Sequence, residues 1–383
     1  MSNPSIALLH EWLTTIGGSD QVAARLGALL GVDRVFTYAA WSSSAATLFP
    51  AIEVTVVGPQ LDLVARNWQW FLPHMPLAWR SVDLTGFDVV VTSSHSCVNS
   101  VRPRADALLI SYCHTPMRYA WEWRSEAKRL SPWLRPAVPP AAAVMRAADR
   151  RWAQRVDLFL ANSRFVAGRI ARFYGKPSLV VYPPVDTAYW TRDPDAQRED
   201  YFLLSGRLVA YKRPDLVVAA ASASGSRLVV AGGGPMFDEL RRIAGPGTTF
   251  VQDPSRERLR DLYRRAKGYV FGGIEDFGMS IVEAQACGTP VLATAAGGAL
   301  ETVVPGVSGV LLESPTVSDF GEAMKLFRPE HYDPEAIRAG ALRFGVEGFD
   351  HRVSWAVEKA LARGWSELKS DPGWVEASGA LLR

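Results

Sequence analysis

The chain has 383 residues, of which 48% are hydrophobic and 21% charged, and its formal net charge is +3. These values are typical of a folded globular protein and exclude a disordered or fibrous chain. The length exceeds that of one ordinary core and predicts two domains. No apolar run approaches the roughly 18 residues of a membrane span, and the first residues lack the basic-then-apolar order of a secretory signal, so we expect a cytoplasmic protein.

Short apolar runs alternate with longer helical patterns through the first half of the chain. Nearly all residues of these runs are apolar, which is typical of parallel strands covered by helices on both faces. The alternation predicts a doubly wound α/β domain over residues 1–186. The predicted strands are residues 6–9, 54–57, 89–91, 108–111, 158–161 and 179–181.

Two loops of the first half follow predicted strands and carry residues suited to a ligand. Gly17 and Gly18 precede a helical run, as in loops whose amides hold phosphate, although such glycine pairs also form plain turns. His114 follows a strand ahead of Pro116, which places it where ligands bind in open α/β sheets, although a lone histidine is more often structural. His95 also follows a strand, where it could touch an acceptor or equally be a turn histidine.

Residues 118–155 form a basic, tryptophan-rich stretch with nine basic and three acidic residues. Such a mixture suits contact with the anionic inner surface of the cell membrane, with the tryptophan rings at headgroup level. A solvated helix face with ordinary core tryptophans is an equally open reading. Nucleic acid would also attract a basic patch, but we expect no nucleic-acid partner. The tryptophans are Trp121, Trp123, Trp133 and Trp152.

Residues 187–200 are predicted to be a linker, because the prolines at 183–184 and a polar stretch interrupt the alternation. Asp193 and Asp195 in this linker imitate a metal-binding Asp-x-Asp motif, but we interpret them as a turn and expect no metal site. The three cysteines have no paired or metal-type spacing and are expected to be reduced core residues. They are Cys97, Cys113 and Cys287.

The alternation of apolar runs and helical patterns restarts after the linker and predicts a second doubly wound domain over residues 201–350. Apolar residues at helical spacing then predict an amphipathic helix within residues 351–383. The predicted strands of the second domain are residues 202–204, 228–231, 249–251, 269–271, 291–293 and 310–312.

The segment EDFGMSIVE, from Glu275 to Glu283, carries the strongest functional signal. Phe277 and Gly278 place a flexible turn before a helical run, so the amides of a helix N-terminus would face a ligand. The two glutamates would lie roughly 12 Å apart along a helix, farther than the carboxylate pair of glycoside hydrolases. This spacing fits two hydroxyl-bearing rings separated by a diphosphate. Taken alone, a surface glutamate and a helix-capping glutamate explain the pair equally well.

Further motifs surround this segment. It continues into EAQACGTPVLATAAGG and is preceded by LLSGRLVAYKRPDLVVAA, VVAGGGPMFDEL and LRDLYRRAKGYVFGGIEDFG. Together they resemble the retaining glycosyltransferases of family 4, of GT-B fold, over nearly the whole second half. The resemblance implies two Rossmann-like domains facing each other across a cleft, with the C-terminal helix crossing back to the first. In the first half, HTPMRYAW resembles bacterial mannosyltransferases of surface-polysaccharide assembly.

The resemblance also implies roles for the charged residues of the second half. Arg207 and Lys212 match the pair that holds the donor diphosphate, where fixed cations stabilise the charge growing on the leaving group. Glu275 matches the glutamate near the donor sugar. Glu283 matches the one that binds the ribose hydroxyls.

Backbone groups and a histidine complete the implied site. The backbone of Phe277, Gly278, Met279 and Ser280 would bind sugar hydroxyls and phosphate oxygens, and Ser280 would also cap the following helix. In the first half, the resemblance places the Gly17–Gly18 loop against the donor phosphates and His114 near the donor sugar and phosphate. Family members often have glutamate where Asp20 stands, which leaves the role of Asp20 open.

The predicted function is retaining transfer of a hexose to an acceptor hydroxyl, with mannose from GDP-mannose as the first choice and a lipid-linked glycan of polysaccharide synthesis as the acceptor. No metal or cofactor is expected beyond the nucleotide diphosphate sugar. A UDP-sugar with a soluble metabolite or natural-product acceptor is an alternative. A noncatalytic sugar-nucleotide-binding protein is an alternative of another class. A nicotinamide-dependent dehydrogenase is disfavoured because no G-x-G-x-x-G follows a strand.

Overall fold

The computed structural model describes residues 4–60, 62–66, 68–123 and 136–363. The chain divides into two compact units, each with its own core. The first unit contains residues up to Tyr182 together with those from Asp350 onward, and the second contains Pro183–Phe349. Residues 187–200, expected to form a linker, belong to the second unit.

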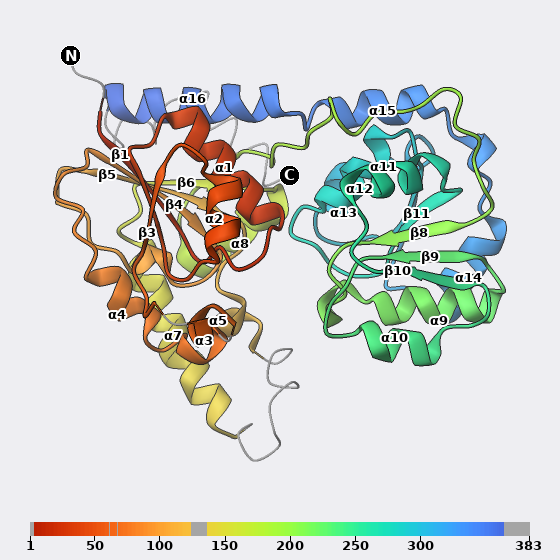
Figure 1. The fold of residues 1–383 in the computed structure, drawn as a ribbon, viewed down its shortest axis with the longest axis horizontal. Coiled ribbons are helices and arrows are strands. Elements are labelled where there is room, and N and C mark those ends of the chain that lie inside the picture. Colours follow the sequence, from red (N-terminus) through yellow and green to blue (C-terminus); the bar gives the residue numbers. More distant parts are fainter. Residues whose placement is uncertain (1–3, 61, 67, 124–135, 364–383) are drawn as a thin grey trace. The chain divides into compact units, whose positions relative to one another are not determined.

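A seven-stranded parallel sheet forms the centre of the first unit, in the order β3-β2-β1-β4-β5-β6-β7 (Figure 1). The central strands β1, β4, β5 and β6 are almost fully buried, and all six strands predicted for this half are present. The prediction omitted β2, whose four residues include an exposed arginine at the start. The strands are β1 Ile6–His10, β2 Arg34–Thr37, β3 Glu53–Val56, β4 Val89–Ser94, β5 Leu108–Cys113, β6 Leu158–Ala161 and β7 Leu179–Val180.

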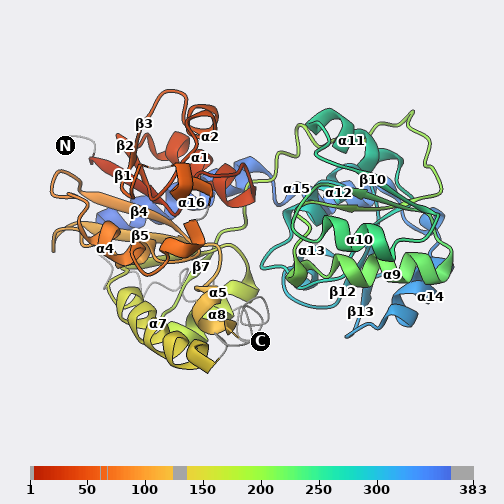
Figure 2. The ribbon, with the colours of Figure 1, turned by 60° about the horizontal axis from the view of Figure 1, so that its bottom comes forward.

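Helices cover both faces of this sheet, with α1 (Gly18–Leu30) and α2 (Ser42–Leu48) on one side and α7 (Val138–Ala153) and α8 (Arg164–Tyr174) on the other (Figure 2). Local sequence explains the ends of α8, because Ser163 accepts a hydrogen bond from the amide of Val166 and Gly175 ends the helix in the left-handed conformation. Shorter helices are α3 Asp62–Arg66, α4 Met75–Arg80, α5 Arg118–Trp121, η1 Trp68–Phe71 and η2 Val98–Ser100.

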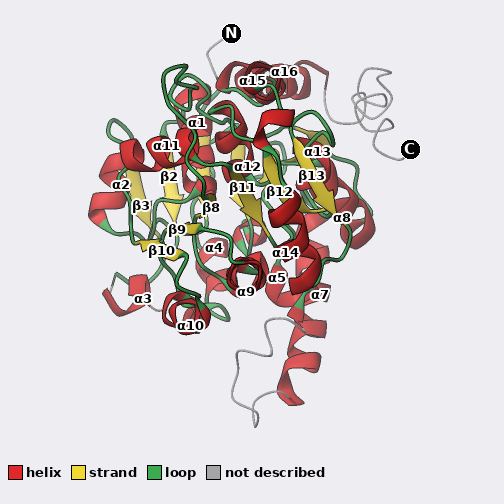
Figure 3. Cartoon of the chain, turned by 90° about the vertical axis from the view of Figure 1, so that its right-hand side faces the viewer, coloured by secondary structure: helices red, strands yellow, loops and turns green. Residues whose placement is uncertain are grey.

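The second unit contains a six-stranded parallel sheet in the order β10-β9-β8-β11-β12-β13 (Figure 3). Counted within the unit, this is the order 3-2-1-4-5-6 of dinucleotide-binding folds, and the first six strands of the first unit have the same order. All six strands predicted for this half are confirmed. They are β8 Phe202–Ser205, β9 Leu228–Ala231, β10 Thr248–Val251, β11 Gly268–Phe271, β12 Val291–Thr294 and β13 Gly309–Leu312.

Helices α9, α10 and α14 lie on one face of the second sheet, and α11, α12 and α13 lie on the other (Figures 1 and 3). Helix α15 packs against α12. The bounds of these elements are η4 Ala210–Lys212, α9 Pro214–Ser224, α10 Phe237–Ile243, α11 Arg256–Arg265, α12 Met279–Ala286, α13 Ala299–Thr302, α14 Val317–Leu326, η5 Pro329–His331 and α15 Pro334–Leu342.

The predicted C-terminal helix is present as α16 (Val346–Arg363). It begins in the second unit, and its residues from Asp350 belong to the first. There Asp350 forms an ion pair with Arg25 of α1, and Arg352 donates a hydrogen bond to the Val180 carbonyl at 3.3 Å. Among the described helices, none is long and apolar enough to cross a membrane. The three cysteines are free and buried, as predicted.

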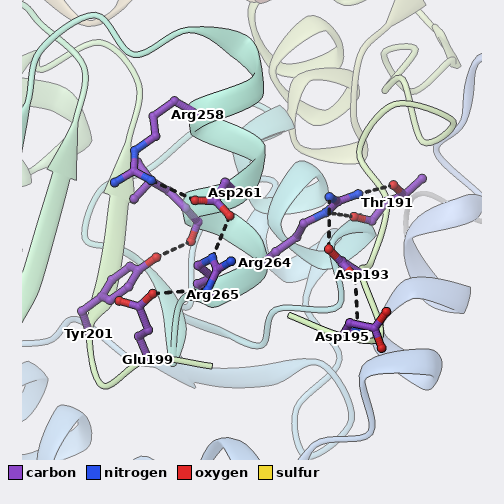
Figure 4. Close-up of polar contacts among 10 residues, drawn as sticks. Thr191, Asp193, Asp195, Glu199, Tyr201, Arg258, Asp261, Arg264 and Arg265 are labelled. Carbon is purple, nitrogen blue, oxygen red and sulfur yellow. Dashed lines mark hydrogen bonds and ion pairs between the residues drawn. The ribbon is translucent and has the colours of Figure 1, made fainter. Parts of the chain in front are cut away.

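The segment 187–200 is held to α11 by polar contacts (Figure 4). Arg264 donates two hydrogen bonds to Thr191, at 2.6 Å to its carbonyl and 2.7 Å to its hydroxyl oxygen. The amide of Asp195 donates to the carboxylate of Asp193 at 3.1 Å, and the amide of Ala196 donates to the Asp193 carbonyl at 3.2 Å. Asp193 and Asp195 therefore form a turn, as predicted. Within the described part of the chain, no group of three His, Cys, Asp or Glu side chains could hold a metal ion.

Candidate active site

The loop after β8 carries the two cationic residues predicted to bind a diphosphate. Gly206 follows the strand with φ +108°, a conformation that favours glycine. The loop after β9 lies against it, because a Cβ on Gly232 would be 2.3 Å from the Gly206 carbonyl oxygen. Arg207 is exposed, and its guanidinium has no hydrogen-bond or ion-pair partner among the described residues. Lys212 ends η4, also beyond the carboxyl end of β8.

Lys212 forms an ion pair with Glu275, with Nζ and Oε1 2.8 Å apart and side chains 20% and 17% exposed. Gly273 permits this approach, since a Cβ there would lie 2.5 Å from the Cα of Lys212. Burial alone would lower the pKa of Lys212, but the Glu275 carboxylate raises it above the ordinary range for lysine. The lysine is therefore a fixed positive charge at neutral pH.

A pair of glycines supports the backbone around Glu275. The amide of Gly298 donates a hydrogen bond to the Glu275 carbonyl at 2.9 Å. A Cβ on Gly297 would lie 2.2 Å from that same carbonyl oxygen, and one on Gly298 would lie 2.1 Å from the Phe277 carbonyl oxygen. Neither position can carry a side chain without moving the loop. The glycine pair at the end of the run ATAAGG is thus explained by the backbone positions of Glu275 and Phe277.

The turn predicted before α12 is present, with Gly278 at φ +90° as the N-cap residue. The prediction that Ser280 caps the helix is wrong, because Ser280 lies inside α12 and its hydroxyl accepts a hydrogen bond from Tyr269 at 2.8 Å. The Phe277 ring is buried against Phe344, with centroids 5.3 Å apart, so only its backbone can face a ligand. Met279, half-buried, is the first residue of α12.

Glu283 lies on α12 and is linked to two buried hydroxyls. Tyr263 of α11 donates a hydrogen bond to Glu283 Oε2 at 3.1 Å, and the Tyr263 oxygen lies 2.7 Å from Ser205 Oγ at the end of β8. Burial raises the pKa of Glu283 to about 7, against the opposing effect of the Tyr263 hydrogen bond and the positive charges of Arg256 and Lys212. A carboxyl group held in this way can accept hydrogen bonds from neighbouring hydroxyls.

In the first unit, the glycine loop and Asp20 form the start of α1. Gly17 is the N-cap residue, and its amide donates to Asp20 Oδ2 at 2.6 Å. The other carboxylate oxygen, Oδ1, lies 2.8 Å from Nε2 of His10, the last residue of β1. Asp20 therefore connects the Gly17–Gly18 loop to the end of a central strand, which answers the question that the sequence left open.

The contacts of His10 continue to His114. Ser93 Oγ, at the carboxyl end of β4, lies 2.9 Å from His10 Nδ1 and 2.8 Å from His114 Nε2. His114 follows β5, and its amide donates to the Ser94 carbonyl at 2.8 Å. Burial is the main cause that lowers the pKa of His114 to about 3, so its imidazole is neutral at pH 7.

The structure thus joins most of the predicted residues into one cluster in each unit. Sequence reasoning missed four linking side chains. Of these, only His10 gave a signal, as a polar residue ending an apolar strand before the glycine pair. Tyr263, Tyr269 and Ser93 look like ordinary helix or strand residues in the sequence.

The basic, tryptophan-rich stretch does not present all its tryptophans to solvent. Trp152 is 3% exposed, and Trp121 stacks on Phe173 with centroids 4.3 Å apart and donates a hydrogen bond to Asp149 at 2.7 Å. The hypothesis of a membrane role is therefore wrong for Trp152, which is a core residue, while Trp121 is half-buried and packs against the core. Trp133 lies outside the described residues.

Four arginines of the first unit nevertheless lie together. Burial and the charges of Arg102, Arg80 and Arg151 lower the pKa of Arg155. All four side chains are exposed. Arg155 donates hydrogen bonds to the carbonyls of Asn99 and Ser100. We call these four residues the arginine cluster.

Two doubly wound units with the same strand order, each carrying polar residues at the carboxyl ends of its central strands, have the architecture of the GT-B fold. Family models place the chain more narrowly. Residues 16–189 match the model described as Glycosyltransferase Family 4, and residues 191–337 match the model described as Glycosyl transferases group 1. The chain belongs to glycosyltransferase family 4.

Curated relatives match part of the chain. A D-inositol 3-phosphate glycosyltransferase 1 of Catenulispora acidiphila is 35% identical over 59% of this chain and 60% of its own length. A GDP-mannose-dependent alpha-(1-6)-phosphatidylinositol monomannoside mannosyltransferase of Mycolicibacterium smegmatis is 30% identical over 45% of this chain and 53% of its own length. The chain thus spans between half and two thirds of the length of these relatives.

Solved structures match over almost the whole chain. Anabaena Alr3699/HepE in complex with UDP and glucose has a TM-score of 0.70 at 16% identity, covering 93% of this chain and 99% of that one. Sucrose-phosphate synthase of Thermosynechococcus elongatus has a TM-score of 0.68 at 18% identity, covering 94% and 99%. At these identities the matches establish the GT-B fold.

Proposed function

We propose that this protein is a retaining glycosyltransferase that moves mannose from GDP-mannose to an acceptor hydroxyl of a lipid-linked glycan in polysaccharide synthesis. The observation that carries the proposal is the ion pair between Lys212 and Glu275, at the carboxyl ends of β8 and β11. It fixes a cation and a carboxylate beside the N-terminus of α12, whose free amides suit phosphate and hydroxyl oxygens.

In the proposed reaction, the bond between the sugar C1 and the β-phosphate oxygen breaks, and its electron pair leaves with the diphosphate. Arg207 and Lys212 stabilise the charge that grows on that oxygen. The acceptor oxygen attacks C1 from the same face, and its proton passes to the departing phosphate. Glu275 holds a hydroxyl of the donor sugar, and Glu283 accepts from the ribose hydroxyls. The two cations and the α12 amides neutralise the diphosphate without a metal ion.

The backbone of residues 277–280 and the Gly17–Gly18 loop bind the remaining phosphate and sugar oxygens in this proposal. His114 contacts the donor sugar through Nδ1, which makes no hydrogen bond within the described part of the chain. The choice of GDP-mannose is supported by the similarity to the mycobacterial GDP-mannose-dependent enzyme. The arginine cluster supports contact with an anionic membrane surface, where a lipid-linked acceptor resides.

A donor panel tests the proposal. The purified chain is incubated with GDP-mannose, UDP-glucose, UDP-galactose and ADP-glucose, with membrane lipid extract as acceptor, and nucleotide release is measured together with labelled sugar in the lipid fraction. We expect acceptor-dependent release of GDP and an α-linked product. Release of UDP but not of GDP would show that the donor is a UDP-sugar instead of GDP-mannose. Nucleotide binding without acceptor-dependent release from any donor would overturn the transferase assignment in favour of a noncatalytic binding protein.

A further inference from the structure

A continuous chain of four buried or half-buried polar side chains runs through the first unit from the Gly17–Gly18 loop to His114. Its links are Asp20 Oδ1 to His10 Nε2 at 2.8 Å, His10 Nδ1 to Ser93 Oγ at 2.9 Å, and Ser93 Oγ to His114 Nε2 at 2.8 Å. Asp20, His10 and Ser93 are 3%, 0% and 0% exposed. Because these three side chains are shielded from water, the four residues themselves determine where the protons lie along this series of hydrogen bonds.

The chemistry of each link fixes the direction of the hydrogen bonds. A carboxylate can only accept, so Asp20 requires a proton on His10 Nε2. A neutral His10 then has a lone pair on Nδ1 and accepts from the Ser93 hydroxyl. The Ser93 oxygen in turn accepts from His114 Nε2, so the proton of His114 lies on Nε2 and its Nδ1 is a hydrogen-bond acceptor. The carboxylate thus determines the tautomer of a histidine two links away.

We propose that Asp20, His10 and Ser93 are positioning residues that set which ring nitrogen of His114 carries the proton and thereby fix Nδ1 as an acceptor for a donor-sugar hydroxyl. The role of Nδ1 rests on the proposed function, whereas the tautomer does not. The neutral state of His114 at pH 7 makes the choice of nitrogen meaningful, because an imidazolium would carry protons on both.

Other titratable groups surround these histidines. Glu11 is fully buried, accepts hydrogen bonds from the amides of Ser96 and Val98, and has a pKa raised by burial to about 7. The His95 ring lies 5.8 Å from that of His10 and 5.9 Å from that of His114.

Three further groups complete these surroundings. The Tyr112 ring lies 5.1 Å from that of His114. Burial lowers the pKa of His95, and the positive charge of Arg118 lowers it further. Asn162 donates to the His114 carbonyl at 2.9 Å and holds its backbone. A change of rate with pH would therefore not report the tautomer of His114.

The substitution Asp20→Asn changes the hydrogen bond between residue 20 and His10 while it keeps the one with the Gly17 amide. The Asn oxygen can still accept from the Gly17 amide, while its NH2 group faces His10 Nε2 and requires a lone pair there. Every link then reverses, and His114 is protonated on Nδ1. Asp20→Glu is the matched control, because it keeps the carboxylate.

Nitrogen-15 NMR of histidine-labelled full-length protein without substrate reports the tautomer directly. We expect a protonated Nε2 on His114 in the natural protein and in Asp20→Glu, and a protonated Nδ1 in Asp20→Asn, with the His114 signals assigned by their loss in His114→Gln. An unchanged His114 tautomer in a folded Asp20→Asn variant would overturn the proposal. If Asp20→Asn does not fold, Ser93→Ala gives the same test, since it should leave both tautomers of His114 populated.

Kinetics separate this proposal from the proposed function. Asp20→Asn should lower kcat at least about tenfold, by analogy with catalytic histidines whose carboxylate partner is changed to an amide. In a His114→Ala background, the same substitution should lower it no further. Equal losses in both backgrounds would assign Asp20 a merely structural role. Full activity of His114→Ala would refute the sugar contact of His114. The tautomers seen by NMR would still show whether Asp20, His10 and Ser93 set the protonated nitrogen of His114.

Discussion

The ion pair between Lys212 and Glu275 gives the sharpest test of the second unit. Lys212→Met removes the charge and keeps an apolar stem, and Glu275→Gln removes the charge and keeps the shape. At 2.8 Å and an effective dielectric constant of about 20, Coulomb's law gives a gross attraction of about 6 kcal/mol. Desolvation and partial solvent screening of side chains exposed by about a fifth reduce the expected loss to about 2–3 kcal/mol for each single variant.

Urea unfolding of the four proteins of a double-mutant cycle measures this energy. The double variant should lose less free energy of unfolding than the sum of the single losses, with a coupling of about 1–2 kcal/mol, because neither charge is then left alone. Sugar-transfer assays on the same proteins measure the second effect. Lys212→Met should lower kcat by about 10²–10³, or about 3–4 kcal/mol, since it removes a cation that faces the growing phosphate charge.

Lys267→Met in the same unit is the matched control. Lys267 pairs with Asp200 at 3.1 Å, but the Asp200 side chain is 77% exposed, so we expect a change of less than about 1 kcal/mol in stability and normal transfer. Additive losses in the cycle would refute the coupling between Lys212 and Glu275. Normal transfer by folded Lys212→Met would refute its proposed role, whatever the stability data show.

Three other predictions concern pH and charge. Because the pKa of Glu283 is raised to about 7, nucleotide affinity should rise from pH 6 to pH 8 as the carboxylate forms. In calorimetry, Glu283→Gln should bind nucleotide about tenfold more weakly and show no such rise. An equal rise in both proteins would contradict the proposed ribose contact of Glu283. The pKa of His114 is lowered to about 3, so the native state binds fewer protons than the unfolded state between about pH 3 and 6.5, and stability is lost as pH falls below 6.5. In urea unfolding at pH 5, this loss should be about 2 kcal/mol larger for the natural protein than for His114→Asn. Parallel curves of stability against pH for the two proteins would exclude the effect. In a sedimentation assay at low salt, the double variant Arg102→Gln with Arg151→Gln should bind anionic vesicles about thirtyfold more weakly than the natural protein. The control double variant Arg241→Gln with Arg242→Gln on α10 should bind them normally. Equal binding by both double variants would exclude the arginine cluster as the contact.

Strand positions were predictable from the sequence because parallel strands buried on both faces must be almost wholly apolar. β11 and β12 are examples, as their burial leaves room only for apolar or small residues. β2 escaped prediction because its run is short and begins with an exposed arginine. The turn at Gly278, whose backbone is proposed to bind a ligand, was likewise predictable from a glycine between a strand and a helix.

The side chains that hold the site together were not predictable, because their partners are distant in the sequence. Tyr263 reaches Glu283 from another helix, and Ser93 lies 83 residues from His10. Ser280 shows the converse error, since a serine near a helix start suggests a cap until the position of Tyr269 is known. A local pattern defines which residues could contact a ligand, while three-dimensional contacts define what holds them.

In the proposed function, Lys212 and Arg207 of the second unit contribute to diphosphate binding in two different ways. Lys212 is neutralised by Glu275 before any donor arrives, so the pair contributes a fixed cation with little net charge to attract the donor. Arg207, exposed and without a partner among the described residues, contributes the net positive charge together with the amides at the start of α12. Most of the desolvation of Lys212 has already occurred in the folded protein, where its side chain is 20% exposed, so it opposes donor binding less than the desolvation of Arg207 does. We therefore propose that Arg207 acts mainly in capturing the donor, whereas Lys212 acts mainly as the sugar bond breaks, when charge moves onto an oxygen that a preorganised cation stabilises.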